Sequence, residues 1–268
     1  MNQQARLARL LPPIRSDIAF MTRFSSFLLA ALALLAASAP AHASVVITGT
    51  RIIFAAQERE ATVNLLNNGK DPSLVQVWVD DGDSRAAPET LQVPFTVTPA
   101  LARIEPAQGQ SIRLLHTGSP MASDRESIFW FNMLEVPPKA KDSNVLQLAF
   151  RTRIKLLYRP QGLPGKPEDA PALVTWHRAP GQDGKPHTLV GRNPTAYFVN
   201  LGGIKVEFNG QSTSLGTGYI APYSLAHFSP SAPINPSATI NFTSINDYGA
   251  GHNNSAPLSA VTATTPSP

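Results

Sequence analysis

The sequence of 268 residues contains no cysteine. A chain without thiols cannot form disulfides, use a thiolate nucleophile or bind a metal through sulfur. Its stability must therefore come from the burial of apolar surface, and its length is sufficient for one or two hydrophobic cores.

Other signatures of chemistry are missing as well. No glycine-rich phosphate loop precedes a helix, and no serine nucleophile motif is present. The six histidines lack the spacing of metal ligands: His42, His116, His177, His187, His227 and His252. The sequence therefore predicts no catalytic residue, no metal site and no cofactor, and ATP-driven action is not expected.

Residues 1–43 are typical of a secretory signal peptide. A short basic start at residues 21–23 precedes the apolar run 27–37 and the small-residue cleavage pattern 41–43. The run is too short to span a bilayer comfortably, so we expect cleavage rather than a retained membrane anchor. The mature chain is expected to begin near Ser44, and Met21 is an alternative initiator.

The net charge gives little support for a nucleic-acid partner. The full chain carries +4, but the leader contributes four arginines against Asp17, so its removal leaves +1. Cations are concentrated instead in residues 139–159, where Asp142 is the single anion. They are Lys139, Lys141, Arg151, Arg153, Lys155 and Arg159.

Short β-rich runs separated by turn signals fill the mature chain. The expected strands of a first domain cover residues 45–54, 60–66, 74–79, 95–104, 111–115, 128–135 and 145–158. This density of strands is typical of an immunoglobulin-like sandwich. Residues 160–170 indicate a linker, and residues 171–250 a second, smaller β-domain, with strands expected at 173–177, 187–190, 197–201, 204–208, 219–228 and 238–245. Residues 251–268 are interpreted as a low-complexity tail.

Residues 144–158 carry the most informative pattern. Alternation in an extended chain places apolar residues on one face, namely Leu146, Leu148, Phe150, Ile154 and Leu156. The other face carries Arg151, Arg153 and Lys155. Taken alone, this pattern favours an ordinary half-buried strand that covers its own core.

A series of motifs in fixed order changes that interpretation. They are TRIIF at 50–54, TP at 98–99, RIEP at 103–106, RESIFWFN at 125–132, VPP at 136–138, IKLLYRP at 154–160, NPTAYF at 193–198 and INDYG at 245–249. Each motif is weak alone. In this order and spacing they resemble the periplasmic pilus-assembly chaperones, the PapD-like family, over most of the mature chain.

The resemblance implies an all-β fold of two immunoglobulin-like β-sandwich domains in a boomerang arrangement, the first formed by residues 44–159. It implies a non-enzymatic chaperone of the periplasm that binds incomplete pilus subunits by donor-strand complementation. The chaperone would deliver these subunits to an outer-membrane usher. Residues 144–158 match the donor strand, and the short connection 136–144 matches the short-loop subclass.

The resemblance also assigns roles to individual residues. Arg51 and Lys155 match the two cations that hold the C-terminal carboxylate of the subunit. Leu146, Leu148 and Phe150 match the side chains that enter the groove of the subunit. Strict alternation places Lys155 on the face opposite these three, and a bulge, a twist or a bend of the strand would reconcile the two roles.

Three further residues match an interdomain ion network: Glu126, Arg159 and Asp247. Thr98 and Pro99 match a position where a cis bond can form a rigid turn. Two features depart from the family. The second domain lacks the disulfide that many relatives carry, and the tail shows no obvious closing strand.

Two other classes of protein are alternatives. The main alternative is a secreted structural or adhesive protein with two sandwiches, such as a fibre subunit, but a subunit should begin with a donor extension of its own. Here strand signals begin almost directly after Ser44. A carbohydrate-binding or hydrolytic sandwich would need clustered aromatics or a pair of carboxylates, which the sequence does not show.

Overall fold

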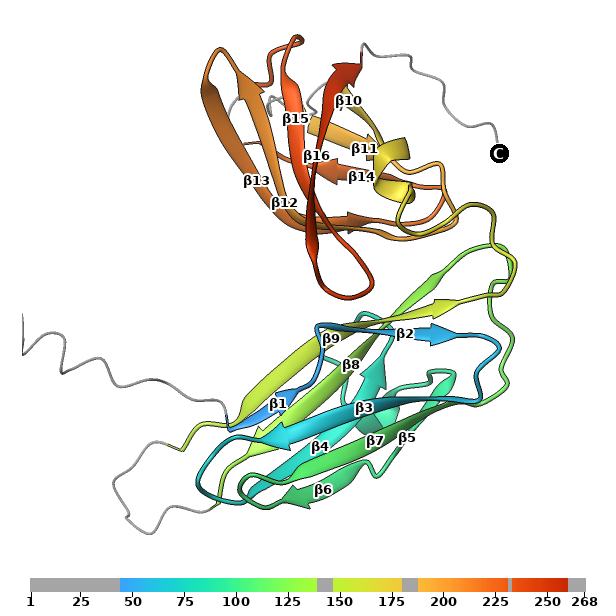
Figure 1. Ribbon diagram of the computed structural model, residues 1–268, viewed down its shortest axis with the longest axis vertical. Helices are drawn as coiled ribbons and strands as arrows, with labels where there is room; N and C mark the ends of the chain where they lie inside the picture. The colour runs from blue at the N-terminus through green and yellow to red at the C-terminus, as the bar shows by residue number, and fades with distance from the viewer. Residues whose placement is uncertain (1–43, 139–146, 180–187, 231–232, 260–268) are drawn as a thin grey trace, which may run out of the picture. The chain divides into compact units, whose positions relative to one another are not determined.

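A computed structural model describes residues 44–138, 147–179, 188–230 and 233–259 (Figure 1). The described chain is almost entirely β, with two short 3-10 turns at Pro88–Thr90 and Ala170–Leu173. No helix in these ranges is long and apolar enough to cross a membrane. The expected all-β fold with two β-rich domains is confirmed.

The first domain is built from two sheets. One has the order β1 (Val45–Ile47), β3 (Glu60–Asn67), β7 (Gly109–His116) and β5 (Phe95–Thr98). The other has the order β2 (Arg51–Ala55), β9 (Phe150–Arg159), β8 (Ser127–Val136), β4 (Ser73–Asp80) and β6 (Leu101–Ile104). The core lies between them and contains Phe54, Leu65, Leu114, Phe131 and Leu156. This arrangement of alternating inward side chains is that of a sandwich.

Two expected strands of this domain are each divided in the structure. The run 45–54 becomes β1 and β2, which belong to different sheets, and Gly49 between them has φ +124°. Glycine adopts this conformation without a steric penalty, so the chain can change sheets there. The run 95–104 becomes β5 and β6, separated by a cis peptide bond between Thr98 and Pro99. The cis bond that the sequence suggested as one option at this position is thus present.

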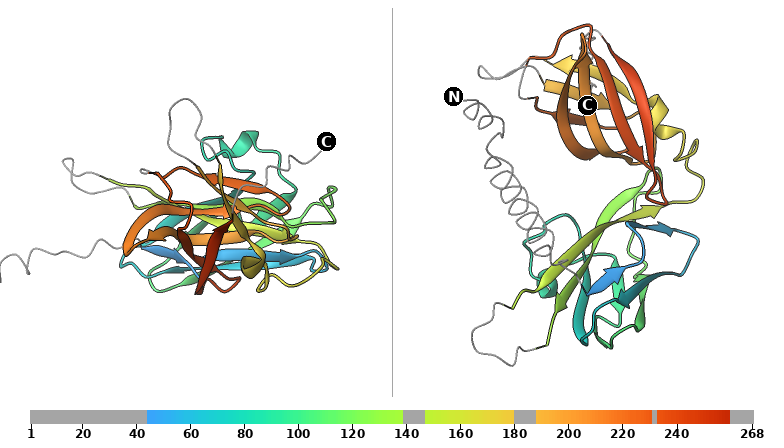
Figure 2. Two further views of the ribbon diagram at one scale, coloured as in Figure 1. Left: turned by 90° about the horizontal axis from the view of Figure 1, so that it is seen from above. Right: turned by 60° about the vertical axis from the view of Figure 1, so that its left-hand side comes forward.

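The second domain forms a sheet with the order β13 (Gln211–Ile220), β12 (Val199–Phe208), β15 (Thr239–Ile245), β16 (Gly251–Ser259), β10 (Thr175–Ala179), β11 (Thr188–Arg192) and β14 (Leu225–Phe228). Its core surrounds the fully buried Trp176. Figure 2 shows the curvature of this sheet from other sides.

The expectation of a low-complexity tail from residue 251 was wrong. Residues 251–259 form β16, which pairs with β15 along its length and with β10 in parallel at Leu258 and Ser259. Most of its side chains are polar, while Ala256 and Leu258 pack against the core. The strand was missed because only these two residues carry the apolar alternation that identifies a half-buried strand.

The segment 219–228 was also expected to be one strand. In the structure it contains the end of β13 and all of β14, and β13 itself was not predicted. β13 has few large apolar side chains, and its glycines are weak strand formers. Its hairpin with β12 turns at Asn209 and Gly210, both of which have positive φ, and this dipeptide is a strong hairpin signal.

Candidate functional site

The last strand of the first domain has an edge that is only partly paired. β9 pairs with β8 from Phe150 to Tyr158, but with β2 only from Lys155 to Arg159. Among the described strands, none pairs with residues 150–154 on the side of β2. An unpaired edge presents backbone donors and acceptors and is a template for another strand.

Apolar side chains are exposed at this same end. Leu148 is 52% exposed and Phe150 is 46% exposed, whereas Ile154 and Leu156 on the same face contact the core. On this apolar face, residues 154 and 156 therefore cover the core of the first domain, whereas residues 148 and 150 lie beyond its edge. Leu146, the third expected groove contact, lies outside the described residues.

The face of Lys155 is fixed by regular pairing. The register between β8 and β9 runs without a shift from Phe150 to Tyr158, so no bulge is present there. Lys155 therefore remains on the face opposite Phe150, as strict alternation requires. A bulge between Phe150 and Lys155 therefore does not reconcile their opposite faces.

Arg51 and Lys155 are direct partners in the parallel register of β2 and β9. Lys155 Nζ donates a hydrogen bond to Asn200 Oδ1 at 2.6 Å, and Arg51 Nη1 donates to the carbonyl oxygen of Ile245 at 3.1 Å. In the part of the chain that the structure describes, neither forms a salt bridge. The structure thus brings the two expected anchor residues together.

Burial disfavours the charge of both members of this pair. Burial, with a contribution from the charge of Arg51, lowers the pKa of Lys155 to about 8. Burial also lowers the pKa of Arg51, and the charge of Asp247 opposes this effect. Two poorly solvated cations side by side favour an anion as their common partner, because its negative charge offsets the cost of burying each cation.

Two other cations of β9, Arg151 and Arg153, share one carboxylate partner, Asp80, which could not be identified from the sequence. Asp80 is fully buried and accepts hydrogen bonds from Arg153 Nε at 3.0 Å and Asn132 Nδ2 at 2.8 Å. Arg151 Nη2 lies 3.6 Å from the same carboxylate. Burial acts to raise the pKa of Asp80, but these hydrogen bonds lower it overall. The cation surplus of residues 139–159 is therefore partly neutralised at β9.

Glu126, Arg159 and Asp247 lie in one hydrogen-bonded network. Arg159 Nε donates to Glu126 Oε1 at 2.6 Å, and its two terminal nitrogens donate to Asp247 at 2.7 and 3.0 Å. Glu126 Oε2 also accepts the backbone N–H of Phe198 at 2.7 Å. The network thus links residues of the first and second β-domains.

The electrostatic balance of this network depends on Arg159. Burial raises the pKa of Glu126, and the charge of Arg159 opposes the rise. Burial acts to lower the pKa of Arg159, but its hydrogen bonds to Asp247 and the charge of Glu126 raise it overall. Each buried charge is therefore stabilised mainly by its partners.

The loop between β15 and β16 fixes the position of Asp247. Asn246 Oδ1 accepts the backbone N–H groups of Tyr248 at 3.1 Å and Ala250 at 2.9 Å. Gly249 has φ +86°, and a side chain there would collide with Thr50, the neighbour of Arg51. Only glycine fits both the backbone angle and the close approach.

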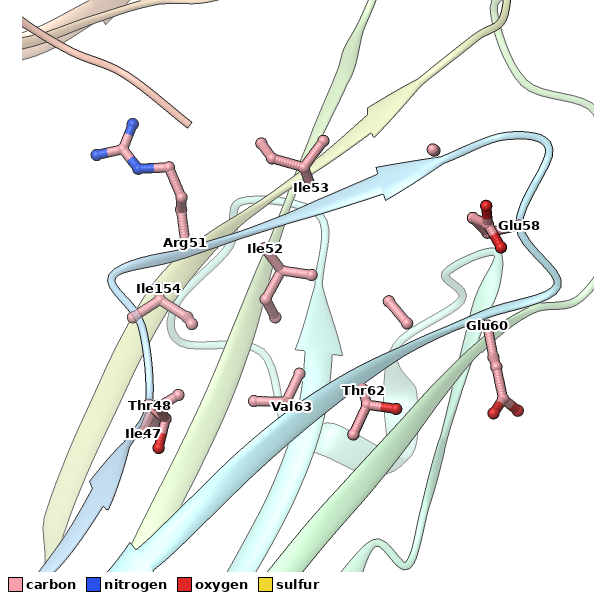
Figure 3. A pocket seen from close by; sticks show the side chains of 12 residues that line it. Ile47, Thr48, Arg51, Ile52, Ile53, Glu58, Glu60, Thr62, Val63 and Ile154 are labelled. Carbon is pink, nitrogen blue, oxygen red and sulfur yellow. The ribbon is translucent and has the colours of Figure 1, made fainter. Parts of the chain in front are cut away.

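A depression of about 430 Å³ opens between β2 and β3 (Figure 3). Its lining includes Ile52, Val63 and Ile154. Figure 3 shows that Arg51 leaves β2 on the side opposite Ile52, so its guanidinium points away from this apolar lining. The described residues contain no group of His, Asp and Glu that could hold a metal ion.

Two models of known domain families match the chain. The N-terminal domain of the PapD pili and flagellar-assembly chaperones matches residues 44–164. The C-terminal domain of the pili assembly chaperone PapD matches residues 169–256. Together the two matches cover most of the sequence.

Individual proteins show the same similarity. The chaperone protein FimB/FhaD of Bordetella pertussis is 48% identical over 200 residues, which are 72% of this chain and 80% of that protein. A crystal structure of the YadV chaperone is 40% identical and covers 80% of this chain and 100% of its own, with a TM-score of 0.70. The Salmonella enterica structure of the SafA pilin in complex with the SafB chaperone is 29% identical, with a TM-score of 0.66, and covers 82% of this chain and 99% of its own.

Proposed function

Because this chain belongs to the family of PapD-type pilus-assembly chaperones, its role is in pilus assembly, and we propose that it lends the free edge of β9 to pilus subunits in the periplasm. The observation that supports this mechanism most directly is the end of β2 pairing at Lys155. Residues 150–154 have no partner on that side among the described strands, and Leu148 and Phe150 are exposed there. A chaperone of this kind is not an enzyme.

Strand addition alone does not supply enough binding free energy for a stable complex. Full burial of a Leu or Phe contributes about 1.5 to 3 kcal/mol, and each backbone hydrogen bond about 0.5 to 1.5 kcal/mol net. Leu148 and Phe150 are already about half buried, so each supplies less than this full value. Association itself costs about 4 to 15 kcal/mol. A strand alone would therefore bind weakly, and an additional interaction with a charged group of the subunit would be needed.

The pair of Arg51 and Lys155 supplies that anchor and also fixes the register. A strand added along residues 150–154 meets the beginning of β2 at Arg51 and can extend no further. If its C-terminal carboxylate binds the two cations, the added strand runs parallel to β9. Charge-assisted hydrogen bonds then prevent the slippage that strand pairing alone would allow.

The proposed partners follow from the relatives. A pilin is the partner of SafB in a solved complex, and pilus subunits are therefore the proposed ligands here. Delivery of these subunits to an outer-membrane usher completes the proposal. In this scheme, the network of Glu126, Arg159 and Asp247 holds the two domains in the orientation that keeps Arg51 and Lys155 close to Ile245 and Asn200.

Replacing Leu148 by glutamate tests the use of this edge. We expect the mature protein to form a one-to-one complex with a co-expressed exported subunit. The variant should bind at least about 100-fold more weakly, since an unpaired charge would enter an apolar groove. Leu173→Glu is the matched control, because Leu173 is 55% exposed but lies far along the chain in Ala170–Leu173. Isothermal titration measures both. Equal affinities would show that another edge is used.

The affinity for a subunit is expected to depend on pH through Lys155. Its pKa is about 8 in the free protein, and a bound carboxylate raises this pKa. Binding is therefore strongest below the free pKa and weakens as the pH rises above it, by at most about tenfold per unit. Lys155→Arg, which stays charged, should abolish this dependence. Identical affinities of the unaltered protein at pH values well below and well above 8 would contradict the prediction.

A further inference from the structure

Among the residues that the structure describes, one buried carboxylate of the first domain has no cation beside it. Asp80, Glu126 and Glu135 are all buried, with Glu135 only 3% exposed. Asp80 and Glu126 form salt bridges with arginines, whereas Glu135 forms none with the residues that the structure describes. A buried carboxylate without a counter-charge is costly, so Glu135 requires an explanation.

The partners of Glu135 are at the very start of the described chain. Its Oε2 accepts the backbone N–H of Val45 at 3.1 Å, and its Oε1 accepts the hydroxyl groups of Ser44 and, at 3.0 Å, Ser73. The carboxylate therefore binds the first two described residues.

Ser44 is held in place from a second direction as well. Its carbonyl oxygen accepts the backbone N–H of Asn68 at 2.6 Å. Gly69 lies so close that a side chain at this position would collide with the Ser44 side chain. Residues 68 and 69 therefore contact Ser44 closely, and Glu135 also binds it through its hydroxyl group.

We propose that Glu135 is the binding site for the α-ammonium group of the mature N-terminus. Ser44 is the expected first residue after the leader is removed. Hydrolysis of the bond between Ala43 and Ser44 leaves a carboxylate on the leader and a primary amine on Ser44, which is protonated near neutral pH. The Ser44 nitrogen is three bonds from the Ser44 hydroxyl oxygen and three bonds from the Val45 nitrogen. Because both of these atoms already bind Glu135, the ammonium group lies within reach of the same carboxylate.

This ion pair, called the latch below, holds the edge strand β1 in place. β1 has only three residues and pairs only with β3 among the described strands, so it has few backbone hydrogen bonds of its own. Pairing of the ammonium with Glu135 fastens Ser44, the residue before β1, to β8. While the leader is attached, the nitrogen is a neutral amide, so the latch closes only after export and cleavage.

A double-mutant cycle on the exported protein tests the latch. Mass spectrometry is expected to show Ser44 as the first residue. Insertion of Gly-Gly after Ala43 keeps Ser44 and Val45 but moves the ammonium group away, and should lower the Tm by about 4 °C or more. In a Glu135→Gln background the same insertion should change the Tm little. Glu105→Gln, a change at an exposed carboxylate paired with Arg103, is the control and should retain the full loss.

Three outcomes would overturn the proposal. They are a mature chain that begins elsewhere, an insertion without effect on the Tm, and an equal loss of Tm with and without the Glu135→Gln substitution. If Glu135→Gln does not fold, the proposal is tested by the rate at which the α-amine is acylated, compared between the unaltered protein and the Gly-Gly variant. A paired terminus should react at least about tenfold more slowly than the Gly-Gly terminus, and equal rates would exclude the latch.

Discussion

Replacing Lys155 by methionine is expected to abolish stable capture of a subunit while the protein remains folded. Methionine keeps an unbranched apolar side chain but removes the charge that faces the proposed carboxylate. Loss of one partner of a buried, hydrogen-bonded ion pair costs about 2 to 5 kcal/mol, or roughly 30-fold to several thousand-fold in affinity. Because the strand alone binds weakly, the complex should no longer be recovered by co-purification.

The fold should not suffer from this change. Burial lowers the pKa of Lys155 to about 8, which means that the folded protein disfavours its charge. Removing the charge relieves this penalty, although the hydrogen bond to Asn200 is lost. The Tm of Lys155→Met should therefore be similar to that of the unaltered protein, so that a binding defect cannot be attributed to unfolding.

Arg51 and a subunit variant make the test more specific. Arg51→Met should cause a similar loss of binding, and the double variant should bind little worse than either single one, because both cations hold one carboxylate. A subunit whose C-terminus is extended should lose the same affinity for the unaltered chaperone. Lys205→Met in the exposed part of β12 is the control. Normal co-purification of subunits with Lys155→Met would exclude the anchor.

Sequence alone could suggest Arg51 and Lys155, because both lie in motifs that resemble the family. It could not show that they are neighbours. That follows from the parallel pairing of β2 with β9, which joins segments about a hundred residues apart. Asp80 illustrates the same limit. Alternation places Arg151 and Arg153 on the outer face, but their common carboxylate comes from another strand, and cross-strand partners depend on the register of the whole sheet.

In the second domain, weak local signals concealed two strands. β16 contains Pro257 and several polar residues, and its place in the sheet is fixed by pairing with β15 and β10. Tertiary pairing thus overrides a poor intrinsic preference for strand structure. For β13 a usable signal was present, since the Asn209-Gly210 turn predicts a hairpin even where the following strand is rich in Ser, Thr and Gly.

Replacing Arg159 by leucine is expected to cause the largest loss of stability. Arg159 is the cation beside Glu126, which is only 2% exposed, and it also binds Asp247. Removing one partner of a buried ion pair costs about 3 to 5 kcal/mol, because the other charge remains buried and uncompensated. For a chain of this size the Tm should fall by roughly 6 to 20 °C, which calorimetry can measure.

The matched control is Arg103→Leu. Arg103 pairs with Glu105, but the two side chains are 65% and 56% exposed, so the loss should remain below about 1 kcal/mol. A comparable loss of stability in both variants would show that the buried position of the Glu126 pair has no special importance.

The pH dependence of Arg159→Leu provides a second, independent test of the charge argument. Burial raises the pKa of Glu126, and without Arg159 nothing among its described salt-bridge partners opposes that rise. A carboxyl group whose folded pKa lies above its unfolded pKa takes up a proton on folding, so stability increases as the pH falls. The deficit of Arg159→Leu should therefore shrink on acidification, and adding Glu126→Gln should recover much of it at neutral pH. A deficit that is unchanged by both would mean that Arg159 stabilises the chain through the packing of its aliphatic stem rather than through its ion pair with Glu126.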